Sequence, residues 1–161
     1  MKTLKSVLIV LFFTIFSLTG VFFFFGLTVN LTESMPLGFY QFSSSNNVDI
    51  VKNDLVIFNI PEKSEQLLKR VIATENDHIV VNQDGVFLNS VLIPNSKIFY
   101  FDSKGHPLTP KFMDRTLTKN EIFAMGEHIQ SYDSRYFGIV HVKENNIRKV
   151  HLLFTWSSHN G

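Results

Sequence analysis

Apolar and polar positions are unevenly distributed along this chain. No charged residue occurs from Ser6 to Thr32, whereas the rest of the sequence mixes apolar and polar positions. The apolar stretch Val7–Val29 would span about 34 Å as a helix, enough to cross a hydrocarbon core of about 30 Å. The pattern therefore predicts a short N-terminus and a transmembrane anchor over residues 1–29, followed by a separate domain over residues 30–161.

A cleaved secretory signal peptide is the alternative, because Lys2 and Lys5 supply a basic start. The apolar stretch is longer than the usual core of about 7–15 residues, and Thr28-Val29-Asn30-Leu31 offers no Ala-x-Ala-like cleavage site. We therefore expect a retained anchor. Because the two lysines flank only its N-terminal side, the positive-inside rule places the N-terminus in the cytoplasm and residues 30–161 outside.

After the anchor, short β-branched runs alternate with turn signals. Lys52-Asn53-Asp54, Glu75-Asn76-Asp77 and Asp84-Gly85 are such turns, and the last is typical of a hairpin. The pattern predicts roughly eight to ten strands and no long helix. The expected strands are 48–51, 55–58, 67–73, 78–81, 86–88, 98–101, 122–124, 138–142 and 150–155. Prolines and a glycine break up residues 84–120, which favours a smaller β subdomain or flap there.

Composition excludes several classes of function. The net charge of only +1 does not indicate the basic surface that nucleic-acid binding requires, so we expect no nucleic-acid partner. The absence of cysteine removes thiol catalysis, disulfides and cysteine-ligated zinc together. The six histidines show no H-E-x-x-H or similar ligand spacing, so we expect neither a metal nor a cofactor.

The candidate chemistry begins with Ser34, a few residues beyond the apolar stretch, and Lys69 in an apolar strand-like segment. A serine hydroxyl needs a base to become a nucleophile. Strand alternation places Lys69 on the same face as Leu67 and Val71, and burial of that face would lower the lysine pKa and yield a neutral amine. From this segment alone, the alternative remains that Lys69 and Arg70 lie on an exposed strand and have no catalytic role. A Ser-His-Asp triad also remains open, although the G-x-S-x-G elbow is missing.

Four segments, in order, resemble the conserved boxes of the bacterial type I signal peptidase (leader peptidase) family. They are T-E-S-M-P at 32–36, N-D-L-V-I-F at 53–58, K-R-V-I-A-T-E-N-D at 69–77 and G-E-H-I-Q-S-Y-D-S-R-Y-F-G at 126–138. Asn53, Ala73 and Asn76 stand where the family has glycine. One short motif would be weak, but four in sequence behind one apolar segment are a specific signal.

The extended first box, N-L-T-E-S-M-P-L-G-F-Y at 30–40, is most similar to the conjugative-transfer branch of that family, the pilin-maturation peptidases. The small domain of about 130 residues suits that branch better than a housekeeping signal peptidase. The resemblance implies a mostly antiparallel β-sheet ectodomain of signal-peptidase type on the membrane surface, behind one N-terminal transmembrane helix. In a bacterium, this places the protein in the inner membrane with its catalytic domain in the periplasm.

The resemblance also implies a role for particular residues. Ser34 would be the nucleophile and Lys69 its base, and the oxyanion would be held by the Ser34 N–H and the Thr32 hydroxyl. Ser131 would orient the lysine amine. Three further residues would give structural support, Asp133 and Arg135 as an ion pair and Asp54 in a turn.

The sequence therefore predicts a membrane-anchored serine endopeptidase that processes an exported precursor protein, such as a conjugative pilin, with small side chains before the cut. A general signal peptidase, a peptidase that cyclises its product and a non-catalytic domain of a secretion apparatus are the alternatives. Expected partners are the precursor, the bilayer and a conjugative or secretion apparatus. Met35, Pro36 and Phe39 are expected to dip into the outer leaflet, from their position alone.

Overall fold

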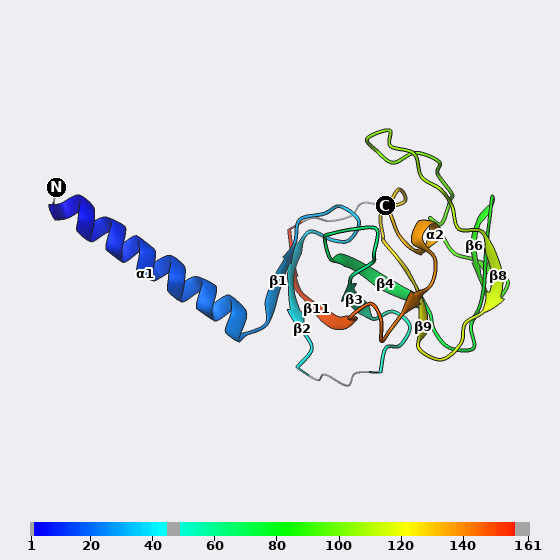
Figure 1. The fold of residues 1–161 in the computed structure, drawn as a ribbon, viewed down its shortest axis with the longest axis horizontal. Coiled ribbons are helices and arrows are strands. Elements are labelled where there is room, and N and C mark those ends of the chain that lie inside the picture. Colours follow the sequence, from blue (N-terminus) through cyan, green and yellow to red (C-terminus); the bar gives the residue numbers. More distant parts are fainter. Residues whose placement is uncertain (1, 45–48, 157–161) are drawn as a thin grey trace.

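A computed structural model describes residues 2–44 and 49–156 of the chain. A single long helix, α1 (Lys2–Phe24), extends away from a β-rich body (Figure 1). Within the described chain it is the one helix that is long and apolar enough to cross a membrane, with a mean hydropathy of 2.1 over Leu4–Phe22. The apolar window of that segment is not buried by the rest of the molecule, and Phe22 at its end contacts the Phe39 ring.

The larger sheet has seven antiparallel strands in the order β1-β2-β11-β3-β4-β9-β10. Their bounds are β1 Leu27–Asn30, β2 Gly38–Phe42, β3 Leu55–Phe58, β4 Leu67–Ala73, β9 Glu121–Met125, β10 Val140–His141 and β11 Arg148–Thr155. The C-terminal strand β11 thus lies between β2 and β3, far from its neighbours in sequence. Residues 27–29, assigned to the anchor from the sequence, lie in β1.

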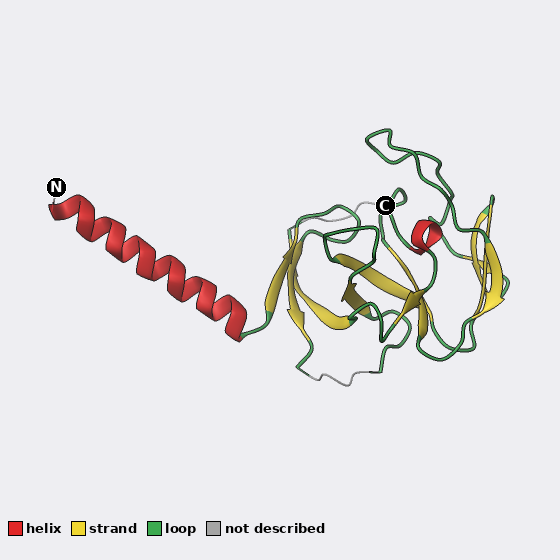
Figure 2. Ribbon diagram, in the orientation of Figure 1, coloured by secondary structure: helices red, strands yellow, loops and turns green. Residues whose placement is uncertain are grey.

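A second antiparallel sheet of four strands lies at the end of the body farthest from α1 (Figure 2). It has the order β7-β6-β5-β8, with bounds β5 His78–Asn82, β6 Gly85–Leu88, β7 Val91–Leu92 and β8 Met113–Thr116. The short helix α2 (Ser134–Phe137) follows β9. A mostly antiparallel β fold behind one apolar helix is therefore confirmed.

Apolar side chains fill three clusters. One cluster includes Val56, Phe58 and Val71 on one face of the larger sheet. Another joins the two sheets through Phe123 and Ile79. Strand β4 contributes to both clusters. Val71 and Ala73 lie two positions apart on the strand and are both fully buried, Val71 in the first cluster and Ala73 in the second.

Two expected strands are absent from the described chain. Residues 49–51 form no strand, because the Val51 N–H donates to the Asp54 carboxylate and closes a turn; residue 48 lies outside the described residues. Residues 98–101 form only an isolated bridge between Phe101 and Pro107. Here the Phe99 N–H donates to the Tyr136 hydroxyl, so a side chain takes the place of a neighbouring strand.

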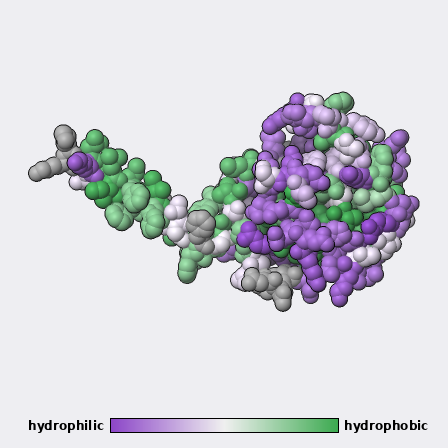
Figure 3. Space-filling view, in the orientation of Figure 1, coloured by the Kyte–Doolittle hydropathy of each residue, from purple (hydrophilic) through white to green (hydrophobic). Residues whose placement is uncertain are grey.

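The apolar surface of α1 continues onto the adjoining part of the β body, whereas the remaining visible surface is mainly hydrophilic (Figure 3). Exposed apolar side chains of this region include Phe25, Val29 and Leu31. Met35, by contrast, is fully buried in a cluster with Tyr40 and Val150. The expectation that Met35 dips into a bilayer is therefore wrong, because its side chain fills the core beneath the β1–β2 connection.

Candidate active site

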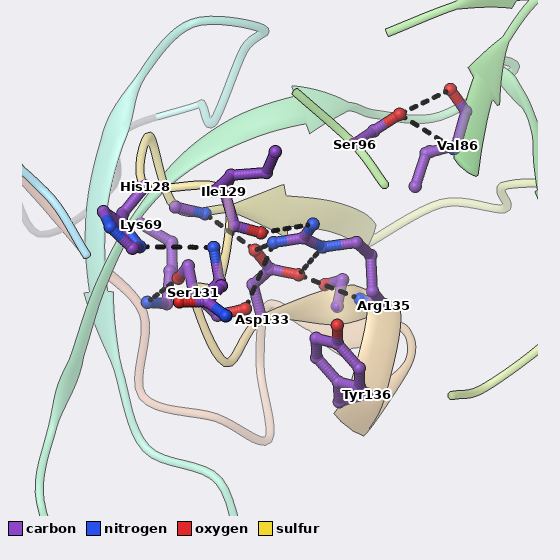
Figure 4. A network of polar contacts seen from close by, with 12 residues as sticks. Lys69, Val86, Ser96, His128, Ile129, Ser131, Asp133, Arg135 and Tyr136 are labelled. Atoms are coloured by element: carbon purple, nitrogen blue, oxygen red, sulfur yellow. Dashed lines mark hydrogen bonds and ion pairs between the residues drawn. The ribbon is translucent and has the colours of Figure 1, made fainter. Parts of the chain in front are cut away.

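Lys69 lies in the middle of β4 and is buried, with 2% of its surface exposed. Its neighbours on the same face of the strand, Val71 and Ala73, are fully buried, so the alternation noted in the sequence points the amine into the protein. The Nζ atom donates a hydrogen bond of 2.9 Å to the Ser131 hydroxyl (Figure 4). An exposed-strand role for Lys69 is thereby excluded.

Burial lowers the pKa of Lys69 from 10.5 to about 8, because the low-polarity surroundings disfavour the charged ammonium. The Asp133 carboxylate opposes this shift and the Arg135 guanidinium reinforces it. The net effect is an amine that loses its proton far more readily than an exposed lysine. This is the property that a lysine base requires.

Ser131 is held by the segment between β9 and α2. The Asp133 carboxylate accepts two hydrogen bonds from the Arg135 guanidinium, from Nε and Nη2, and a third from the Gly126 N–H. Arg135 also donates to the Ser131 and Ile129 carbonyls. Figure 4 shows this fully buried ion pair beside the Lys69–Ser131 contact. The pair fixes the backbone that presents Ser131 to the lysine.

Ser34 lies in the connection between β1 and β2. Its carbonyl accepts a hydrogen bond of 2.8 Å from the Glu127 N–H, which ties this connection to the segment carrying Ser131. Its hydroxyl oxygen is 3.4 Å from the Thr32 hydroxyl oxygen. Ser34 and Lys69 line the same groove, a cavity of about 480 Å³ that is also lined by Thr32 and Tyr132.

The structure thus brings Ser34, Thr32, Lys69 and Ser131 to one groove or its edge. Among the described residues, no hydrogen bond joins Ser34 directly to Lys69. Asp54 is not at the groove: its carboxylate pairs with Lys149 of β11 and accepts from the Val51 N–H.

Two residues of the site lay within the recognised motifs but received no role from the sequence. A Cβ at Gly126 would lie 2.0 Å from the Ser131 Oγ and 2.8 Å from the Ser34 carbonyl oxygen, so only glycine fits between them. Asn30 is buried and contacts the connection that carries Ser34. Their only signal in the sequence was membership of the motifs, since glycine has no side chain and the asparagine amide performs no acid–base chemistry.

One groove of the β domain thus carries both Ser34 and the buried Lys69, and the comparison with known families adds the class of protein. The family model for "Signal peptidase, peptidase S26" matches residues 1–155. The chain therefore belongs to the signal peptidase family, peptidase S26.

Among relatives, the chain is similar to two proteins named plasmid transfer protein TraF from Escherichia coli. One is 28% identical over 162 residues, covering 86% of this chain and 89% of the relative. The other is 31% identical over 136 residues, covering 70% and 74%. A probable conjugal transfer protein TraF from Sinorhizobium fredii is 28% identical, covering 71% and 70%.

Among solved structures, the chain is similar to a signal peptidase I from Enterococcus faecalis V583. The identity is 21% and the TM-score 0.40, covering 66% of this chain and 98% of that one.

Proposed function

We propose that this protein is a membrane-anchored serine endopeptidase in which Ser34 is the nucleophile and Lys69 the general base. The observation that carries the proposal is the buried Lys69 amine, whose pKa is lowered to about 8 and whose Nζ is held by Ser131 at the groove lined by Ser34. At pH 7, a pKa of about 8 leaves about a tenth of the amine neutral, several hundred times the fraction for an exposed lysine.

Each of these groups has a role in the proposed reaction. Neutral Lys69 takes the Ser34 hydroxyl proton as the oxygen attacks the scissile carbonyl, and it returns a proton to the leaving amine. Water then attacks the acyl-enzyme by the same route. Ser131 holds the amine in place, and Arg135 in turn binds the Ser131 carbonyl. Because Arg135 is paired with Asp133, the two opposite charges add little net charge near Lys69.

The negative oxygen of the intermediate needs donors aimed at it. The Ser34 N–H and the Thr32 hydroxyl, whose oxygen lies 3.4 Å from the Ser34 Oγ, are the proposed donors. Small side chains before the cut are implied by the family.

The substrate is proposed to be an exported precursor, a conjugative pilin or a similar transfer protein, because three relatives are named as plasmid or conjugal transfer proteins. The exposed apolar helix Leu4–Phe22 supports the proposed membrane anchor. The lysines at its N-terminal end, Lys2 and Lys5, favour an N-terminus in the cytoplasm and a β body in the periplasm. The proposed division is an anchor ending with α1 at Phe24, a catalytic domain that begins with β1 at Leu27 and a smaller flap at about 84–120.

General removal of signal peptides is the alternative within the same chemistry, and cyclisation would require an amine instead of water to attack the acyl-enzyme. A non-catalytic domain of a secretion apparatus is disfavoured. Such a domain has no use for a buried lysine, and burying an unneeded amine destabilises the fold.

The test is cleavage of a co-expressed candidate pilin precursor in membranes, comparing wild type with Ser34→Ala and Lys69→Ala by intact mass. Loss of the cut in both variants supports the dyad, and a product lighter by one water indicates cyclisation. Ser103→Ala and Lys104→Ala, in an exposed loop, are matched controls that should cleave normally. Cleavage that persists in both Ser34→Ala and Lys69→Ala would contradict the proposal.

A further inference from the structure

The connection that carries Ser34 is organised around a single buried side chain. Asn30 is the last residue of β1, pairs with Gly38 of β2 and is 7% exposed. Between them, residues 31–37 form the loop that presents Ser34 to the groove. A loop of this length has little regular structure of its own, so its shape depends on what binds its backbone groups.

The Asn30 amide binds the loop at both ends. Its Nδ2 donates to the carbonyls of Thr32, Met35 and Pro36 at 2.9, 3.0 and 3.1 Å. Its Oδ1 accepts from the Thr32 N–H at 3.1 Å and from the Thr32 hydroxyl at 2.7 Å. Because carbonyls only accept and a backbone N–H only donates, these partners fix which end of the amide is oxygen.

The direction of the Thr32 hydroxyl follows. Since Asn30 Oδ1 can only accept, Thr32 must donate its single hydroxyl proton to Asn30. The Thr32 oxygen therefore presents lone pairs to the Ser34 Oγ, 3.4 Å away. Thr32 can donate to an oxyanion only after its hydroxyl turns, and Asn30 Oδ1 then keeps the Thr32 N–H as a partner.

We propose that Asn30 is a positioning residue, which holds Ser34 in the groove and sets the place and direction of the Thr32 hydroxyl. The proposal rests on the peptidase function proposed above. Asn30 does not touch the reacting atoms: it acts through the three loop carbonyls and through Thr32.

The kinetic test is a double-mutant cycle with full-length protein in membranes. Thr32→Val removes the hydroxyl, and Asn30→Ala removes the amide that places it. Each is expected to lower kcat by about 10²- to 10³-fold with KM nearly unchanged. Without Asn30 the Thr32 hydroxyl is no longer placed, so adding Thr32→Val to Asn30→Ala should slow cleavage only slightly further. Losses that multiply, or an Asn30→Ala variant with wild-type kcat, would overturn the proposal.

Asn82→Ala is the matched control. The Asn82 side chain also accepts from a backbone N–H, that of Asp84, but it lies in the hairpin of the second sheet. Its kcat should equal that of wild type, and a loss equal to that of Asn30→Ala would show that removing any loop-binding asparagine has this effect.

A second measurement does not depend on cleavage or on any variant. The Asn30 side-chain amide protons should exchange with solvent at least about tenfold more slowly than those of the exposed Asn95 when followed by NMR. Exchange as fast as that of Asn95 would show that the hydrogen bonds of the Asn30 amide are not formed in solution, and so would overturn the proposal. If wild type does not cleave but the Asn30 amide is protected, the proposed function fails while the structural part of the inference stands.

Discussion

A buried amine with a pKa of about 8 changes its protonation within the range in which peptidases are assayed. If neutral Lys69 is the base, activity should be weak in acid and should rise as the pH passes about 8. A profile of kcat/KM on a precursor between pH 5 and pH 9 measures this. A flat profile would oppose lysine as the base.

Lys69→Arg is the matched control for that profile. A guanidinium stays charged over the whole range, so this variant should be as inactive as Lys69→Ala even though it keeps a long basic side chain.

The same pKa shift affects stability. The folded chain holds Lys69 with a pKa of about 8, whereas the unfolded chain keeps 10.5, so below about pH 8 the fold carries a cost of about 3 kcal/mol for a buried ammonium. This cost disappears as the pH rises through about 10.5. Lys69→Met should therefore gain in free energy of unfolding relative to wild type at pH 7, and lose most of that gain by pH 10.5.

Denaturant unfolding at both pH values measures the difference. The exposed Lys104→Met is the control, and its difference from wild type should not change with pH. A Lys69→Met difference that is equally independent of pH would show that burial does not disfavour the charged amine.

Gly126 separates Ser34 from Ser131 so closely that no side chain fits. In Gly126→Ala, the added Cβ would meet the Ser131 Oγ and the Ser34 carbonyl, and so displace the contact of Ser131 with Lys69. We expect cleavage to fall by about 10²-fold or more, as when a catalytic group is misplaced by 1 Å. Gly20→Ala, where nothing lies within 4 Å of the new Cβ, should cleave normally, and an active Gly126→Ala variant would contradict this packing.

Single residues also show what the sequence could establish. Asn53 and Asn76 stand where the family has glycine, and both adopt positive φ, 72° and 70°. Asparagine tolerates this left-handed region better than other side chains, so the departures from the motif keep its turns. Lys69 could be paired with Ser34 only through the resemblance, since strand alternation does not say which face is buried.

At the scale of elements, the strands that carry Lys69 and precede Ser131 were predicted closely, because β4 and β9 are β-rich runs bounded by turn signals. Strand β1 was missed because it continues the apolar run of α1 without a charge or proline. Residues 98–101 have strand composition but lie against Tyr136 instead of another strand, a contact that no local pattern reports.

The Asp133–Arg135 pair joins elements that local patterns do not connect. Arg135 reaches the carbonyls of Lys97 and Ile129 as well as Asp133, and both charged side chains are fully buried. Arg135→Met would leave a buried carboxylate without its main partner, so we expect a loss of about 3–5 kcal/mol in the free energy of unfolding, measured by denaturant titration.

Arg115→Met provides the comparison. The Arg115 side chain is 43% exposed in its pair with Glu121, and its loss should cost no more than about 1 kcal/mol. Equal losses in the two variants would show that the buried pair is not specially important to the fold.

At the scale of the whole molecule, the site depends on contacts between distant segments. Lys69 and Ser131 are 62 positions apart, and β11 pairs with β2 across more than a hundred residues. Periodicity gives the strands but not their order, because antiparallel pairing of non-consecutive strands leaves no local signal. The order in the sheet is what brings the Ser34 loop beside the Ser131 segment.

The junction of helix and domain makes a prediction about the bilayer. Trp156, the only tryptophan in the sequence, lies 5.3 Å from the Phe39 ring, which lies 5.8 Å from Phe22 of α1. Because these rings continue the exposed apolar surface of the helix, Trp156 should lie at the lipid interface. In vesicles, its fluorescence should be quenched by lipids brominated near the headgroup and protected from aqueous iodide.

A tryptophan moved to the far end of the body is the control. In a Trp156→Phe/Phe112→Trp variant, the reporter precedes β8 in the sheet farthest from α1 (Figure 1). Phe112 is already half exposed, so iodide should quench this reporter and brominated lipids should not. If the two positions respond alike, the β body does not rest on the bilayer by its helix-proximal edge. A precursor would then have to leave the membrane surface to reach the groove.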